Sequence, residues 1–251
     1  MSRLPFLVPK RMTNSIAEKK WAKFIRRAKL FNSVPFVDFA LAAGSMAMGN
    51  PHKHSDFDVI VGVKKGRIFT ARFFAVIMFG LRGWRRKKAH DKNVDPKSVA
   101  DKICLSHWVT GKSYRLSPPH NAYWHKLYQS LVPLTGDEGK IREFFEANDW
   151  LKPRRIWPSE SANSHELADG KPDKKFRTTR RSSLRVALEI ILSGKLGDEV
   201  EKLLKKLQVE RIKGGLNDKN NFKPRLICSD HELEFHPDTR RIEEMIANQQ
   251  L

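Results

Sequence analysis

Two aspartates that stand two positions apart, Asp56 and Asp58, lead into the apolar, β-branched run Val59-Ile60-Val61. A run of this kind predicts a β-strand, and alternate residues of a strand project from the same face. Both carboxylates are therefore expected on one face, roughly 7 Å apart along the strand. Like charges this close repel each other, so the pair favours a bound cation. Mg²⁺ is the expected cation, with Mn²⁺ as the alternative, because Mg²⁺ takes only one or two protein carboxylates and adds water and phosphate oxygens.

A second pattern precedes the aspartate pair. Residues 37–43 are mostly apolar and predict a buried strand, which leads directly into Gly44 and Ser45. A short helical turn is expected next, before Gly49-Asn50-Pro51 ends it. Glycine lets a backbone approach a ligand closely, serine offers a hydroxyl at a helix start, and the N–H groups there attract phosphate. The sequence thus predicts a phosphate-binding turn after one strand and a metal site on the next.

In this order and spacing, Gly44-Ser45 and Asp56-Phe57-Asp58 resemble the nucleotidyltransferase superfamily, which has the polymerase-beta-like fold. The resemblance covers about residues 36–61 and extends to Val109. It implies that the Gly-Ser turn binds a nucleoside triphosphate and that the aspartate pair binds divalent metal. Lys53, in the loop between the two motifs, is a further candidate for binding the triphosphate. It further implies transfer of a nucleoside monophosphate to an acceptor hydroxyl.

Active members of this superfamily usually carry a third carboxylate on a later strand. The best later strand here, Ile103–Val109, contains none, and Ser106 is expected at the acidic position. Asp101, Asp95 and Asp91 could substitute for it from the preceding segment. A third acid helps to hold the catalytic metal and accepts the proton of the attacking hydroxyl. Its loss would therefore affect catalysis more than nucleotide binding.

Several functions stay open at this point. An acidic pair at a strand start is also typical of a solvated turn, but the Gly-Ser turn and the apolar strand favour a metal site. The leading hypothesis is a Mg²⁺-dependent nucleotidyltransferase whose acceptor is a small hydroxylated molecule, a protein side chain or an RNA end. The first alternative is a catalytically degenerate protein of the same fold that binds nucleic acid. The second is a regulatory protein that modifies or masks a partner.

The net charge favours polyanionic partners. The chain has 48 Lys and Arg against 28 Asp and Glu, a formal charge of +20. Such a balance is typical of proteins that bind RNA, nucleotides or another polyanion. The run Arg85, Arg86, Lys87 and Lys88 is a candidate phosphate-contacting arm, although basic runs are more often simply solvated.

The sequence also suggests where the protein works. Cys104 and Cys228 are its only cysteines and show no spacing of a disulfide framework, so a reducing cytoplasm is expected. The N-terminus has no pattern of a signal peptide. The most apolar stretch, 69–81, contains Arg72 and falls short of the ~20 residues that span a bilayer, so no membrane association is expected.

The expected fold class is α/β (α+β), with a small mixed-sheet core, flanking helices and a helical C-terminal region. A basic N-terminal helix is expected at 1–33, the core at 34–115, and a mainly helical region at 116–251 with a loop near 152–181. The expected helices are 15–31, 67–82, 122–131, 138–145 and stretches around 184–192 and 200–207, and a last short strand is expected at 225–228.

Two further patterns are set aside. Gly111-Lys112-Ser113 resembles the end of a P-loop, but Ser106 stands where that motif requires its first glycine. His107 lies on the candidate third strand, where a core or hydrogen-bonded role is expected rather than metal ligation.

Overall fold

The computed structural model describes residues 15–86, 96–117, 122–151, 182–214 and 225–236. The helices are α1 (Ser15–Ala28), the 3₁₀ helix η1 (Lys29–Ser33), α2 (Gly44–Met48), α3 (Ile68–Leu81), α4 (Pro96–Val99), α5 (Ala122–Gln129), α6 (Glu138–Ala147), α7 (Ser183–Ile191) and α8 (Gly194–Gly214). The strands are β1 (Val37–Ala42), β2 (Phe57–Val63), β3 (Ile103–Thr110), β4 (Val132–Gly136), β5 (Arg225–Cys228) and β6 (Glu232–His236).

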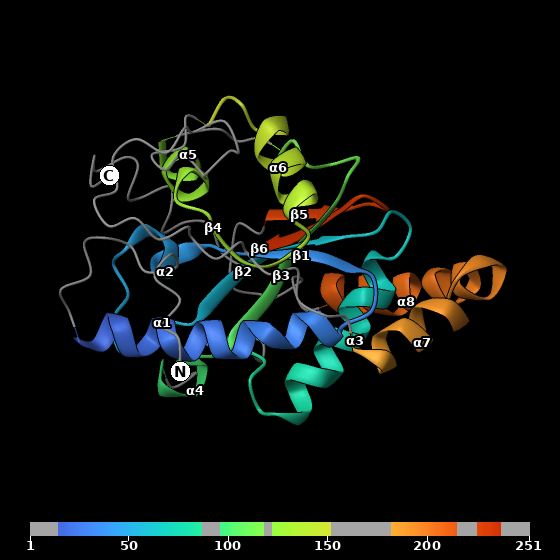
Figure 1. The fold of residues 1–251 in the computed structure, drawn as a ribbon, viewed down its shortest axis with the longest axis horizontal. Coiled ribbons are helices and arrows are strands. Elements are labelled where there is room, and N and C mark those ends of the chain that lie inside the picture. Colours follow the sequence, from blue (N-terminus) through green and yellow to red (C-terminus); the bar gives the residue numbers. More distant parts are fainter. Residues whose placement is uncertain (1–14, 87–95, 118–121, 152–181, 215–224, 237–251) are drawn as a thin grey trace, which may run out of the picture.

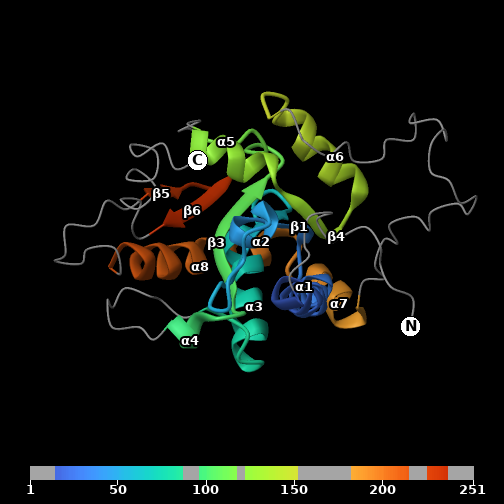
Figure 2. The ribbon, with the colours of Figure 1, turned by 90° about the vertical axis from the view of Figure 1, so that its left-hand side faces the viewer.

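The strands form one mixed sheet in the order β4-β1-β2-β3-β6-β5. Among these described strands only β2 and β3 pair in parallel, and α3 lies in the crossover that a parallel pair requires. Helices α5 and α6 lie on one side of the sheet, and α1, α3, α7 and α8 lie on the other (Figure 1, Figure 2). The expected α/β class with a mixed sheet is confirmed.

Helix α1 covers the sheet with the apolar stripe that its sequence predicts. Trp21 and Phe24 are completely buried, and the ring of Phe24 stacks on that of Phe57 at 4.5 Å between centroids. Phe57 is the residue between the two aspartates, and its side chain enters this core. The opposite face of β2 therefore carries the carboxylates, as strand alternation predicts.

A carboxylate from a distant helix caps α3. Glu201, on α8, accepts hydrogen bonds from the backbone N–H groups of Phe69 and Thr70 at 2.9 and 2.7 Å. It also accepts one from the Thr70 hydroxyl at 2.6 Å. These N–H groups have no partner within their own helix, so the start of α3 is completed by α8.

The expected helices are confirmed within the described residues, as are the strands at 37–43, 57–61, 103–109 and 225–228. The strands β4 and β6 were not expected. Because β4, β5 and β6 all come from 116–251, the sheet extends beyond the expected core at 34–115. The expected loop near 152–181 lies almost wholly outside the described residues. Among the described helices, none is both long and apolar enough to cross a membrane.

Candidate functional site

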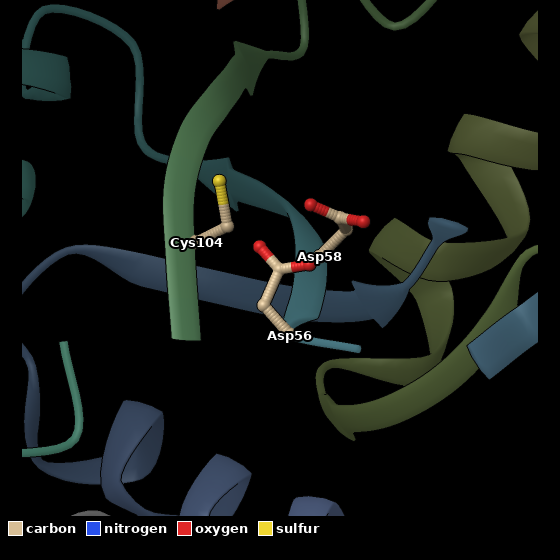
Figure 3. Close-up of side chains that lie close together, drawn as sticks. All are labelled: Asp56, Asp58 and Cys104. Atoms are coloured by element: carbon tan, nitrogen blue, oxygen red, sulfur yellow. The ribbon is translucent and has the colours of Figure 1, made fainter. Parts of the chain in front are cut away.

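The aspartate pair lies where β2 begins, beside β3. One carboxylate oxygen of Asp56, one of Asp58 and the sulfur of Cys104 lie within 4.8 Å of one another. Asp58 and Cys104 are register partners on the two parallel strands, so their side chains leave the same face of the sheet (Figure 3). All three residues are partly exposed, although the thiol group of Cys104 is itself surrounded by protein atoms. The two aspartates that the sequence predicts as one site are therefore brought together, with a cysteine that was not predicted.

The Gly-Ser turn packs directly against this pair. Gly44 has φ +64°, and a Cβ atom on it would lie 2.1 Å from Oδ2 of Asp58. The backbone N–H of the preceding Ala43 donates a hydrogen bond to the Asp58 carbonyl at 3.0 Å. Both the conformation and the close contact require glycine. Ser45 follows within α2 and is partly exposed.

The position beside the pair is taken by Cys104 and not by Ser106, which corrects the sequence-based expectation. The register of β2 against β3 shifts between Asp58 and Ile60, because β3 has an extra residue there. Counting along the strand cannot detect such a bulge. Ser106 lies further along β3, where its hydroxyl accepts a hydrogen bond from the Cys104 thiol at 3.3 Å.

Cys104 does not supply the charge of a third acid. Burial, and then the negative charge of Asp58, raise the pKa of the Cys104 thiol to about 12. The thiol therefore stays neutral near pH 7. A thiol is also a soft ligand, unlike the third carboxylate that the resemblance to nucleotidyltransferases implies.

Arg86 belongs to this site. Its guanidinium donates to Oδ2 of Asp56 at 2.5 Å and lies 3.9 Å from the Cys104 sulfur. The sequence predicts Arg86 as part of a basic arm that contacts nucleic acid, but here its charge is directed at an aspartate. Arg85 lies next to it in a bridge with Ile103, and the expected contacts of 87–88 lie outside the described residues.

A buried lysine supports the loop that leads to Asp56. The ammonium of Lys20, on α1, donates to the backbone carbonyls of Lys53 and Ser55 at 3.2 and 2.9 Å. Lys20 is only 5% exposed, whereas the side chain of Lys53 is exposed and free to meet a ligand. The sequence predicts only a basic helix within 1–33, and this supporting role of Lys20 is not visible from it.

Asp101, a candidate for the third acid, has a structural role instead. Its carboxylate pairs with Lys20 and Lys23, and its backbone carbonyl accepts a hydrogen bond from Arg27. Burial alone would raise the pKa of Asp101, but the two lysines hold it below its usual value. Asp95 and Asp91, which the sequence also offers as a third acid, lie outside the described residues.

The donor set fits a hard divalent cation. Asp56 and Asp58 offer two oxygens at short range, which is the number of protein carboxylates that Mg²⁺ usually takes. Arg86 already neutralises part of the charge on Asp56, which lowers the attraction for the cation. Cys104 adds a sulfur that suits softer ions such as Zn²⁺ better than Mg²⁺.

Comparisons with protein-family models, with curated proteins and with solved structures find no match for this chain. The relation to nucleotidyltransferases therefore depends on the resemblance of Gly44-Ser45 and Asp56-Phe57-Asp58 alone.

Proposed function

We propose that this protein is a metal-dependent nucleotidyltransferase that moves a nucleoside monophosphate from a nucleoside triphosphate to a hydroxyl. The observation that carries the proposal is the contact of Gly44 with Asp58. This contact brings the Gly-Ser turn at the end of β1 against the pair of carboxylates at the start of β2. The contact is so close that the glycine could not carry a side chain. A turn suited to phosphate and a carboxylate pair suited to metal are the two parts that this reaction needs.

The residues take separate roles in this proposal. Asp56 and Asp58 hold Mg²⁺ or Mn²⁺, and Gly44, Ser45 and the exposed Lys53 bind the triphosphate. When bound, the metal neutralises charge that develops on the transferring phosphoryl group. The protein's own share is positioning, which contributes much of the rate in reactions of this kind. The acceptor is open, and the formal charge of +20 favours RNA among the candidates.

A catalytically degenerate protein is the second candidate, and Cys104 favours it. The group beside the aspartates is a neutral thiol rather than a third carboxylate. Such a site can still bind a nucleotide together with one metal ion. It lacks the acid that would hold a second ion and accept the hydroxyl proton.

The test is a transfer assay with each labelled nucleoside triphosphate, mixed hydroxyl acceptors that include RNA ends, and either Mg²⁺ or Mn²⁺. Wild type is expected to form labelled product, and Asp58→Asn is expected to lose it. Asp149→Asn is the matched control, because Asp149 is well exposed in an ion pair with Arg115. Undiminished transfer by Asp58→Asn would refute the assignment of the metal ligands.

The same proteins separate the second candidate from the first. A wild type that binds nucleoside triphosphate in a metal-dependent manner, loses that binding in Asp58→Asn, and forms no product would favour the degenerate protein. Binding that does not depend on metal or on Asp58 would contradict both.

A further inference from the structure

A second group of metal-ligating side chains lies on the same face of the sheet, between β3 and β6. It consists of His107, Glu232 and Glu234, which we call the His-Glu-Glu cluster. One nitrogen of the histidine and one oxygen of each glutamate lie within 4.8 Å of one another. The three side chains are 5%, 4% and 0% exposed. Acidic residues are seldom fully buried without a charged or hydrogen-bonded partner.

Strand register brings the cluster together. His107 is the partner of Glu234 in the antiparallel ladder, and Glu232 lies two positions away on the same face of β6. His107 is also the parallel partner of Ile60, which follows Asp58 on its own strand face. The His-Glu-Glu cluster and the aspartate pair thus lie on the same face of the sheet. The cluster lies between β3 and β6, whereas the aspartate pair lies beside β3 at the start of β2.

The outer oxygens of the two glutamates are already satisfied. Arg225 donates to Oε2 of Glu234 from Nε at 2.9 Å and from Nη2 at 2.8 Å, and its guanidinium lies over the ring of Trp124. The Ser117 hydroxyl donates to Oε2 of Glu232 at 2.6 Å. Carboxylates that bind metal are commonly held by such outer hydrogen bonds. Arg225 thus offsets negative charge within the cluster.

Two inner atoms of the cluster, one on His107 and one on Glu232, are not satisfied by the described residues. Nε2 of His107 and Oε1 of Glu232 are buried and have no hydrogen-bond partner within the described part of the chain. They lie 3.7 Å apart, and Nδ1 of His107 lies 3.9 Å from Oε1 of Glu234. Both separations exceed the hydrogen-bond range of about 3.2 Å. Because an imidazole binds a given ion through only one nitrogen, the relevant separation is the 3.7 Å between Nε2 of His107 and Oε1 of Glu232. It is close to the roughly 3.4 Å that separates the ligand atoms of a tetrahedral ion with bonds of about 2.1 Å.

We propose that His107, Glu232 and Glu234 bind one divalent transition-metal ion, Zn²⁺ in the first instance. An imidazole with two carboxylates suits Zn²⁺ and its first-row neighbours, whereas Mg²⁺ and Ca²⁺ prefer an all-oxygen set. The ion places positive charge between the two carboxylates and satisfies Nε2 of His107 and Oε1 of Glu232 together. The inference is independent of the proposed nucleotidyl transfer.

The expected effect of the ion is structural. The ladder between β3 and β6 contains only three residue pairs, and the ligands lie at the first and the last of them. A bound ion is therefore expected to strengthen the attachment of β6 to β3, and so also of β5, which pairs only with β6 among the described strands. Because an ion that binds the folded state preferentially stabilises it, metal removal is expected to lower the unfolding temperature.

The test uses the full chain with Asp56→Asn, Asp58→Asn and Cys104→Ser introduced to remove the ligands of the aspartate site. The protein is stripped with a chelator, dialysed and titrated with Zn²⁺, Co²⁺ and Mg²⁺. One equivalent of Zn²⁺ or Co²⁺ is expected to bind and to raise the unfolding temperature, whereas Mg²⁺ is not. Bound Co²⁺ is expected to show visible bands without the near-ultraviolet charge-transfer band of a sulfur ligand.

Glu232→Gln and His107→Gln, each made in this background, are expected to weaken Zn²⁺ binding at least about tenfold. Glu232→Gln keeps the volume of the side chain and an acceptor for Ser117, so it serves if the histidine variant fails to fold. His125→Gln is the control, because His125 lies on α5 against Trp150 and outside the cluster. No binding of Zn²⁺ or Co²⁺, or equal binding by Glu232→Gln, would overturn the proposal.

Discussion

The ammonium of Lys20 donates a hydrogen bond to the carbonyl oxygen of Ser55 at 2.9 Å, one residue before Asp56. The same ammonium binds the Lys53 carbonyl and the Asp101 carboxylate. A buried cation with three acceptors holds the loop in one conformation, because each acceptor is costly to leave unsatisfied. Helix α1 therefore determines how Asp56 enters the candidate metal site.

Lys20→Met is expected to lower the free energy of unfolding by about 2 kcal/mol or more, because it leaves buried acceptors without their donor. Mg²⁺ affinity at the aspartate pair is expected to fall as well. Urea denaturation and metal titration measure the two effects. Lys19→Met is the matched control on the exposed face of the same helix. Equal unfolding midpoints for the two variants would contradict the supporting role of Lys20.

Gly44→Ala is expected to displace the Asp58 carboxylate and to abolish Mg²⁺ binding. Gly49→Ala is an informative control, because Gly49 also has a positive φ, +81°. A Cβ atom on Gly49 would have no neighbouring atom within 4 Å. Each substitution costs about 1–2 kcal/mol for the left-handed backbone conformation. Of the two variants, only Gly44→Ala is expected to lose Mg²⁺ binding as measured by isothermal titration calorimetry. If both variants bind Mg²⁺ as wild type does, the contact of Gly44 with Asp58 has no functional part.

Cys104→Asp is expected to increase the affinity for Mg²⁺ or Mn²⁺, because a carboxylate replaces a neutral thiol within 4.8 Å of the aspartate pair. If the chain is an enzyme that a missing third acid slows, nucleotidyl transfer accelerates in parallel. Cys104→Ser removes the sulfur without adding charge and should leave Mg²⁺ affinity near that of wild type. A Cys104→Asp protein with unchanged metal affinity would exclude this position as the third ligand.

Arg86→Gln is expected to strengthen Mg²⁺ binding, because Asp56 loses the cation that competes for its charge. An ion pair of this exposure is worth about 1 kcal/mol, which corresponds to roughly fivefold in affinity. Arg82→Gln is the control, since Arg82 is exposed and donates to the Met78 carbonyl. Weaker Mg²⁺ binding by Arg86→Gln would mean that the arginine orients Asp56 instead of competing for it.

Asp38 is expected to make stability depend on pH. Burial raises the pKa of Asp38 from 3.8 to about 6, although Lys64 and Arg185 act against this rise. The folded state therefore holds the proton more tightly, and this group's contribution to stability falls as pH rises from about 4 to about 6. Asp38→Asn should stabilise the fold at pH 7 by about 1–3 kcal/mol and have little effect at pH 4. Urea denaturation at both values checks the difference, and equal effects at both would contradict it.

The sequence predicts most elements correctly because they follow simple periodicities. The stripe of α1 repeats at helical spacing, and β2 alternates two carboxylates with Phe57 before it becomes apolar. Strand β4 was missed because Pro133 interrupts a very short pattern, although proline is tolerated in an edge strand such as this one. Strand β6 was missed because two of its buried positions are glutamates, which are typical of exposed surfaces.

The candidate site was predicted in part, for a similar reason. Asp56 and Asp58 lie on one strand, where spacing determines their direction. The partners Cys104 and Arg86 come from other segments, so only strand register and the path of the chain after α3 bring them close. For Cys104 a signal was present, since it begins the same alternation as Ser106, but the bulge in β3 could not be located from the sequence.

The cap that Glu201 gives to α3 has a consequence for how the chain folds. Glu201 lies 132 positions after Phe69 and 131 after Thr70. The first N–H groups of α3 therefore obtain this partner only after α8 has been synthesised. A fragment that ends before α8 leaves those groups, and the apolar face of α3 beneath them, without their native cover. Residues 34–115 alone are therefore expected to be less stable than a fragment that extends through α8, so a shorter piece of the chain made for crystallisation or binding work should include α8.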